Sequence, residues 1–187
     1  MWLSGGLCRA FFIGPVAGLE GPAELRRIAL AQAADRTGLS GTPGLWLETA
    51  PLNASHVCVA WDKDMLSTCL NTLRHAGLRV SSARPWWTAC LSAVSQSAAP
   101  AAISAFGVHD CDSLTVLSGD AGGYSGASTL TPITDNSSAT STWLRTLATM
   151  PSGAGNPLLL RLGAHPSSEA PMHWPMALGE WTSEVLT

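Results

Sequence analysis

The segment His56–Trp61, with the sequence HVCVAW, is the feature that most constrains the fold of this chain. Its β-branched and aromatic residues are typical of a buried strand. Asp62 follows directly, and its carboxylate is well suited to accept hydrogen bonds from the free backbone N–H groups that begin a helix. Apolar residues then recur at helical spacing, at Leu66, Cys69, Leu70 and Leu73. A buried strand therefore leads directly into an amphipathic helix.

The end of this helix is also marked in the sequence. In His75-Ala76-Gly77 a basic residue of the last turn precedes a glycine that can adopt the left-handed conformation. Leu78–Val80 then has the composition of a short strand. Strand, helix and strand in this order predict a βαβ unit, whose two strands lie parallel in one sheet. We therefore expect an α/β fold.

Other elements are predicted on both sides of this unit from residue periodicity and turn residues. Before it, we expect a strand at Leu7–Ile13, a helix at Pro22–Thr37 and a strand at Leu45–Glu48. After it, we expect a helix at Pro85–Gln96, strands at Ile103–Val108, Ser113–Leu117 and Ser128–Thr131, a helix at Ser138–Thr149 and a strand at Pro157–Leu162. The residues after Gly163 are rich in Pro, Ser and Trp and are expected to be loosely structured or to lie across a groove. The predicted parts are a strand-helix-strand segment at 1–50, an α/β domain at 51–165 and a tail at 166–187.

Charge and hydropathy exclude several classes of partner. The chain has 10 Lys and Arg residues against 13 Asp and Glu, and Lys63 is its single lysine. Without a basic run, the electrostatic attraction that drives binding to a phosphate backbone is missing, so no nucleic-acid partner is predicted. Although 46% of residues are hydrophobic, no apolar run approaches the roughly 18 residues that span a bilayer. The first residues lack a basic region and are broken by Gly5, Gly6 and Arg9, so a cytoplasmic location is expected rather than secretion.

Cysteines and histidines offer only a weak metal hypothesis. The five cysteines are odd in number and lie mostly in apolar segments, which favours reduced buried thiols over a disulfide framework. The pairs His56/Cys58 and His109/Cys111 together have the ligands for a tetrahedral zinc site, because alternate residues of a strand share one face. Neither pair has the Cys-x-x-Cys spacing of a zinc knuckle, so core packing is the default and no metal site is predicted.

The run GDAGGYSG, Gly119–Gly126, is the candidate nucleotide loop. Its glycines would let backbone N–H groups converge on a phosphate, but it matches no complete fingerprint and joins two predicted strands, which favours a hairpin connection. In the alternative interpretation the phosphate-binding residues are Gly119, Asp120, Gly122 and Gly123, and Asp110 and Asp112 contact Mg²⁺. There is no G-x-S-x-G nucleophile elbow, and no catalytic residue is predicted.

Arg84-Pro85-Trp86-Trp87 is the candidate protein-binding segment. Arg84 can stack on an aromatic face, and paired indoles at a strand-helix junction form a surface on which a partner can dock. The alternative is that the indoles of Trp86 and Trp87 anchor the start of the helix in the core. Adjacent helical residues point about 100° apart, so the two indoles are not expected to be equally buried.

The order of these segments resembles a known fold. The segments VAWDKDMLSTCLNTLRHAGLRVSSARPWW, AAISAFGVHDCDSLTVLSGDAGGYSGASTLTP and PLLLRLG resemble the actin-like fold of the type IV pilus assembly protein PilM and of the cytoplasmic domain of the type II secretion protein GspL. His75-Ala76-Gly77-Leu78 and Leu160-Arg161-Leu162-Gly163 match the family's "helix, Ala-Gly-Leu, strand" segment and its closing strand. The resemblance covers residues 45–165 and implies an α/β, actin-like (ribonuclease H-like) mixed sheet flanked by helices.

The departures from this family bear on function. An active actin-like ATPase has Asp-x-Gly in its second phosphate loop, whereas this chain has Val108–Ser113, without a glycine that would let the backbone approach a phosphate. The N-terminal phosphate hairpin of the family is absent or reduced to Leu7–Ile13, so the resemblance implies an incomplete actin-like fold. The resemblance therefore implies a non-catalytic cytoplasmic scaffold without a cofactor. Its partners would be other proteins, such as inner-membrane pilus or secretion components, and it would lie peripherally at the inner membrane through them. The alternative is an actin-like ATPase that binds ATP with Mg²⁺.

Overall fold

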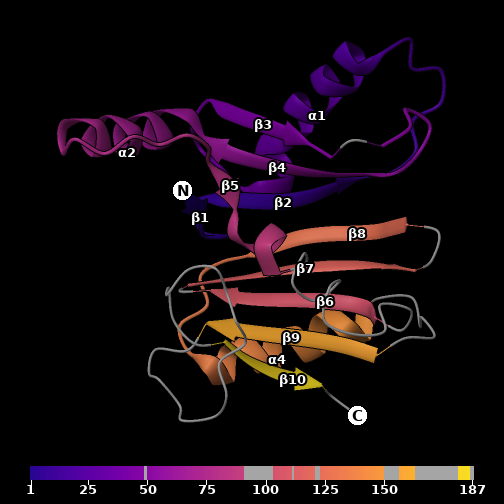
Figure 1. The fold of residues 1–187 in the computed structure, drawn as a ribbon. Helices are drawn as coiled ribbons and strands as arrows, with labels where there is room; N and C mark the ends of the chain where they lie inside the picture. The colour runs from indigo at the N-terminus through magenta and orange to yellow at the C-terminus, as the bar shows by residue number, and fades with distance from the viewer. Residues whose placement is uncertain are drawn as a thin grey trace.

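A computed structural model describes residues 1–48, 50–90, 103–110, 112–120, 123–149, 156–162 and 181–185. Its main feature is an eight-stranded sheet with the order β10-β9-β6-β7-β8-β2-β4-β3 (Figure 1). The strands are β2 (Cys8–Ile13), β3 (Pro43–Leu47), β4 (His56–Asp62), β6 (Ile103–Asp110), β7 (Ser113–Asp120), β8 (Gly123–Leu130), β9 (Asn156–Leu162) and β10 (Trp181–Val185). A separate parallel pair joins β1 (Trp2–Leu3) to β5 (Arg84–Pro85). The helices are α1 (Pro22–Thr37), α2 (Lys63–His75) and α4 (Asn136–Thr149), and residues 86–90 are also helical.

The sheet is mixed, since β6 and β9 are parallel while the other neighbouring strands of the sheet are antiparallel. The prediction of a βαβ unit is wrong. β4 is antiparallel to both of its neighbours, β2 and β3, and Leu78–Val80 is not a strand. Because β2 and β3 occupy both edges of β4, no edge is left for a parallel strand after α2. The chain instead leaves the large sheet and forms β5.

Several local predictions are confirmed. Helix α1 has the predicted bounds, and the Asp62 carboxylate caps α2 by accepting from the N–H groups of Asp64 (2.8 Å) and Met65 (3.0 Å). Gly77 has a φ of 78°, the left-handed conformation expected after the helix. The three strands predicted after Ile103 form two successive antiparallel hairpins.

The predicted tail needs correction. Residues 181–185 form β10, which pairs antiparallel with β9, whereas the residues after Gly163 were expected to be loosely structured. Without β10, β9 would be the edge strand of the sheet, and the unpaired N–H and C=O groups of such an edge can recruit a strand far along the sequence. Residues 163–180 lie outside the described part, as do residues 91–96 of the helix predicted at Pro85–Gln96.

The two faces of the sheet carry different helices. Phe11 is in register with Ser128, and Ser128 with Val116, so these side chains share one face. Phe11 packs with α1 residues, and Val116 packs with Trp143 of α4, so both helices cover this face, behind the sheet in Figure 1. The opposite face packs against the 86–90 helix through a second core of Cys8, Ala10, Val57, Val59, Trp87, Cys90, Phe106, Val108, Leu117 and Leu160.

Strands from both predicted folded parts share this sheet, because β2 and β3 of residues 1–50 flank β4 of residues 51–165. The part boundaries stay a prediction. Among the described helices, none combines the length and apolar character needed to cross a membrane.

Candidate functional site

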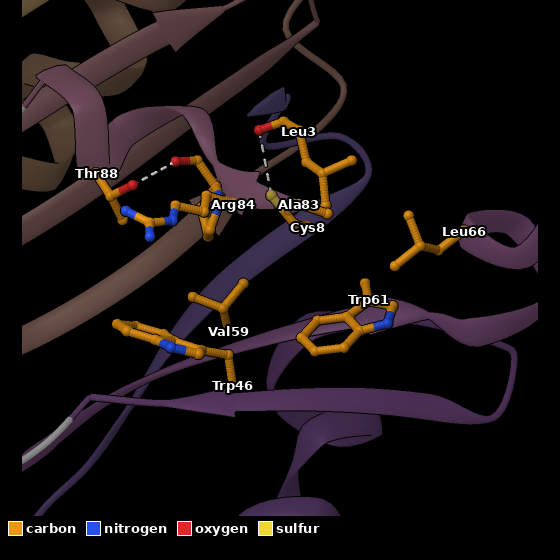
Figure 2. Close-up of a pocket in the computed structure, with 10 residues that line it drawn as sticks. Leu3, Cys8, Trp46, Val59, Trp61, Leu66, Ala83, Arg84 and Thr88 are labelled. Carbon is orange, nitrogen blue, oxygen red and sulfur yellow. Dashed lines mark hydrogen bonds between the residues drawn. The ribbon is translucent and has the colours of Figure 1, made fainter. Parts of the chain in front are cut away.

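A cavity of about 510 Å³ opens on the sheet face opposite α1 and α4 (Figure 2). Its floor comes from β2, β3 and β4, and its walls come from the β1–β5 pair and the first turn of α2. The lining residues are Leu3, Cys8, Trp46, Val59, Trp61, Leu66, Ala83, Arg84, Pro85 and Thr88. We call this cavity the Trp46 pocket.

Strand register explains why the indoles of Trp46 and Trp61 both line the floor. Val59 and Trp61 are two residues apart on β4 and therefore point to the same face. Trp46 of β3 is directly opposite Val59, and Gly44 is directly opposite Trp61. A Cβ at Gly44 would lie only 2.2 Å from the Trp61 indole, so glycine is required for this ring to lie across β3. In Figure 2 the two indoles lie apart along the floor, with Val59 between them.

The opposite wall is held by the N-terminal residues. The Met1 amino group donates to the Ser82 carbonyl (2.7 Å), and the Arg84 N–H donates to the Met1 carbonyl (3.1 Å). The Trp2 and Trp86 rings pack edge to face with centroids 5.8 Å apart. These contacts place Arg84 at the rim of the pocket.

The pocket is apolar with one positive charge. Arg84 is the charged residue of the lining, and it is exposed to solvent. Burial, together with the negative charge of Asp110, raises the pKa of the Cys8 thiol to about 12, so this sulfur is neutral near pH 7. Trp46 is 41% exposed although it lies at the pocket floor. The arrangement can therefore bind an apolar side chain and attract a nearby negative group.

The structure separates the three predicted protein-binding residues. Arg84 is at the surface, and Trp86 is half-buried against Trp2. Trp87 is only 4% exposed and belongs to the core, which is the alternative that the sequence left open. The part that Arg84 and Trp86 play in binding stays a prediction.

Trp46 and Trp61 are the pocket residues that sequence reasoning missed. The signal was present, since the two segments LWLE and HVCVAW were both predicted as strands with a Trp in them. What was missing was their antiparallel pairing, because the βαβ prediction assigned β4 a different neighbour.

The glycine-rich run forms a hairpin, as the sequence favoured. Gly119 and Asp120 end β7, Gly123 begins β8, and Asp120 pairs with Gly123. Gly122 lies outside the described residues. Contact of these four residues with a nucleotide phosphate stays a prediction.

In the alternative ATPase hypothesis, the Mg²⁺ ion contacts Asp110 and Asp112. The structure places these two carboxylates in different environments. Asp112 is exposed, whereas Asp110 is 4% exposed and its carboxylate accepts from the Gly5 N–H (3.0 Å to Oδ2) and from the Ser113 hydroxyl. Burial raises the pKa of Asp110 above its usual value, partly offset by these two hydrogen bonds. Through these hydrogen bonds, the Asp110 carboxylate links the N-terminal turn to the β6–β7 hairpin.

His109 cannot share one metal ion with His56 and Cys58. His56 and Cys58 are on β4, His109 is on β6, and Cys111 lies outside the described residues. Three strands separate β4 from β6, so His109 lies about 19 Å from the pair on β4 at the spacing of roughly 4.8 Å between neighbouring strands. This exceeds any separation that four ligands of one zinc ion allow.

No protein-family model matches the sequence, and no curated protein matches it. A solved structure with a similar fold is the cytoplasmic domain of EpsL, an inner membrane component of the type II secretion system of Vibrio cholerae. The TM-score is 0.51 at 14% sequence identity, and the match covers 89% of this chain. The chain spans 61% of that structure. At this identity the similarity is one of fold.

Proposed function

We propose that this protein is a non-catalytic scaffold with an actin-like fold, which binds a partner protein in a secretion-related assembly. The observation that carries the proposal is the Trp46 pocket, where a 41% exposed indole lies in an apolar cavity with an arginine at its rim. Trp and Arg around a desolvated pocket are the residues most enriched among binding hot spots. Covering the exposed part of the Trp46 indole would contribute roughly 2 kcal/mol.

The similarity in fold supports a secretion-related assembly. The similar EpsL domain is described as the cytoplasmic part of an inner membrane component of a secretion system. By extension, we place this chain in the cytoplasm, held at the inner membrane by its partner. Its partner would then be a pilus or secretion component.

Crosslinking from the pocket tests the proposal. A photoreactive amino acid at position 46 of the full chain, expressed in cells, should crosslink to a pilus or secretion component, which mass spectrometry identifies. Arg84→Ala should reduce this crosslink several-fold, since it removes the charge at the rim. The same photoreactive group at Leu144, which is 49% exposed on α4, is the matched control and should not reach that partner. Equal crosslinking from both positions would contradict the proposal.

A nucleotide titration separates the scaffold from the ATPase alternative. A ligand that binds only the native state adds about 2.7 kcal/mol of stability at 100 times its Kd. We expect no increase in Tm with Mg·ATP or Mg·ADP. An increase that Asp112→Ala abolishes would favour the ATPase instead.

A further inference from the structure

Helix α2 projects from the molecule and carries a partly exposed apolar stripe. Its N-terminal turn lies against the sheet, and the rest extends to the left past the ends of the strands in Figure 1. None of its residues is buried. The stripe consists of the half-exposed residues Leu66, Cys69, Leu70 and Leu73. Leu66 packs against the sheet core, and Leu66 and Cys69 line a small cavity together with Leu3 and Leu7, whereas Leu70 and Leu73 lie further along the projecting part of the helix.

Further apolar side chains extend the stripe at both ends. Leu78 is 58% exposed, and its N–H donates to the Leu73 carbonyl (2.9 Å), which places it directly after the last helical turn. Met65 is 48% exposed, and Leu66 also lines the Trp46 pocket. We call Met65, Leu66, Cys69, Leu70, Leu73 and Leu78 the α2 surface. It is therefore continuous with the Trp46 pocket through Leu66.

Positive charge borders this surface. Lys63 and Arg74 are eleven residues apart, which is close to three helical turns, so they lie on the same flank of the stripe. Neither of them makes an ion pair with another described residue. Asp62 and Asp64 flank Lys63 at the start of the helix, but from Met65 onward Arg74, Arg79 and Arg84 are the charged residues up to position 84, and none of them is acidic.

We propose that the α2 surface binds an acidic amphipathic helix of a partner protein. Apolar residues of that helix would cover Leu70, Leu73 and Leu78, and its carboxylates would face Lys63 and Arg74. A bulky apolar side chain at one end would enter the Trp46 pocket beside Leu66. This deepens the proposed function, on which it rests, by naming the chemistry of the partner.

The charges argue against a second copy of this chain as the occupant. An antiparallel pair of α2 helices would bring Lys63 of each copy beside Arg74 of the other, and like charges in contact are destabilising. A parallel pair would place the positive flank against Met65 and Thr72, which carry no charge. A flat bilayer surface would leave the recessed pocket next to Leu66 unfilled.

Peptide binding to the full chain tests the inference. The probe is a fluorescein-labelled, three-heptad amphipathic helix with Leu on one face and Glu on both flanks, and the control peptide has Lys in place of every Glu. Fluorescence anisotropy should show at least about ten-fold tighter binding of the acidic peptide, weakening as salt is raised. Equal affinity for the two peptides would overturn the inference.

Two variants locate the binding. Leu73→Glu should weaken binding of the acidic peptide about ten-fold or more, whereas Thr68→Glu, which adds the same charge on the opposite face of α2, should have a much smaller effect. Lys63→Glu/Arg74→Glu should reverse the preference toward the basic peptide. Because none of these residues is buried, the variants should fold, which circular dichroism checks.

Other outcomes identify a different occupant and overturn the inference. Binding to vesicles of phosphatidylglycerol and phosphatidylcholine without binding to the acidic peptide would indicate a membrane surface. Concentration-dependent dimerisation that Leu73→Glu abolishes would indicate a second copy. If Leu73→Glu leaves the crosslink from position 46 unchanged, the inference fails while the proposed function stands.

Discussion

At the scale of single residues, Asp110 shows how a buried carboxylate can be tolerated. It is 4% exposed, yet its oxygens accept hydrogen bonds from the Gly5 N–H and the Ser113 hydroxyl. Gly5 allows this approach, because a Cβ there would lie 2.5 Å from the Ser113 hydroxyl oxygen. Burial nevertheless outweighs the hydrogen bonds and raises the pKa of Asp110.

The raised pKa of Asp110 predicts a pH dependence of stability. In the window between the unfolded value, about 3.9, and the higher folded value, the native chain keeps a proton that the unfolded chain has lost. The unfolding free energy should therefore fall as pH rises through this window. The asparagine side chain of the Asp110→Asn variant cannot ionise. The unfolding free energy of this variant should therefore fall less as pH rises through the window. Urea unfolding of both proteins from about pH 4 to about pH 7 measures the difference, and parallel curves would contradict the prediction.

At the scale of elements, α2 depends on its own ends more than on packing. None of its residues is buried, whereas Asp62 caps its first turn and Gly77 and Leu78 close its last turn. In most helices burial of one face supplies much of the stability. The capping interactions at the two ends of α2 therefore determine where the helix lies in the sequence and contribute much of its stability.

Loss of the cap should open α2 locally. Asp62→Ala removes the acceptor for the Asp64 and Met65 N–H groups and should destabilise the helix by about 1 kcal/mol. Hydrogen exchange of the α2 amides should accelerate about five-fold, while exchange in β6 and β7 stays close to wild type. Asp62→Asn keeps a capping oxygen and is the matched control. Unchanged exchange in α2 of Asp62→Ala would show that packing, not capping, holds this helix.

At the scale of the whole molecule, the sheet separates two sets of buried side chains. Cys8 and Cys90 lie in the core that contains Trp87, and Cys58 lies in the core under α1. All four described cysteines carry free thiols, and Cys69 is only half-buried. Burial raises the pKa of each thiol of Cys8, Cys58 and Cys90 to about 12, so all three are neutral and shielded in the native state.

Thiol labelling should therefore report global unfolding from both faces of the sheet. In a Cys69→Ser/Cys111→Ser variant, Cys8, Cys58 and Cys90 should react with a thiol reagent only as the protein unfolds, because the thiolate is the reacting species. Mass spectrometry of protein labelled at increasing urea concentrations should show the three modifications appearing together. Rapid labelling of any one of them in native buffer would contradict the described core.

Much of the local structure could be predicted from sequence alone. Helix α1 and the capped start of α2 follow from periodicity and end residues, which act within a few positions of each other. The hairpins of β6, β7 and β8 follow from turn residues between short strands. For the site, Arg84 was recognised, but the pocket floor of Trp46 and Trp61 was not, because it exists only when β3 pairs with β4.

The sequence by itself determined where helices and turns begin and end, since their hydrogen bonds join residues three or four positions apart. Only the tertiary structure decided which strands are neighbours. β4 has β2 and β3 at its edges, and β9 pairs with β6 and β10, across separations that no local pattern encodes. The same non-local pairing buried Trp87, left Trp46 exposed beside Arg84 and directed α2 away from the sheet. The physical reason is that a strand satisfies its backbone through whichever edges the rest of the chain leaves open.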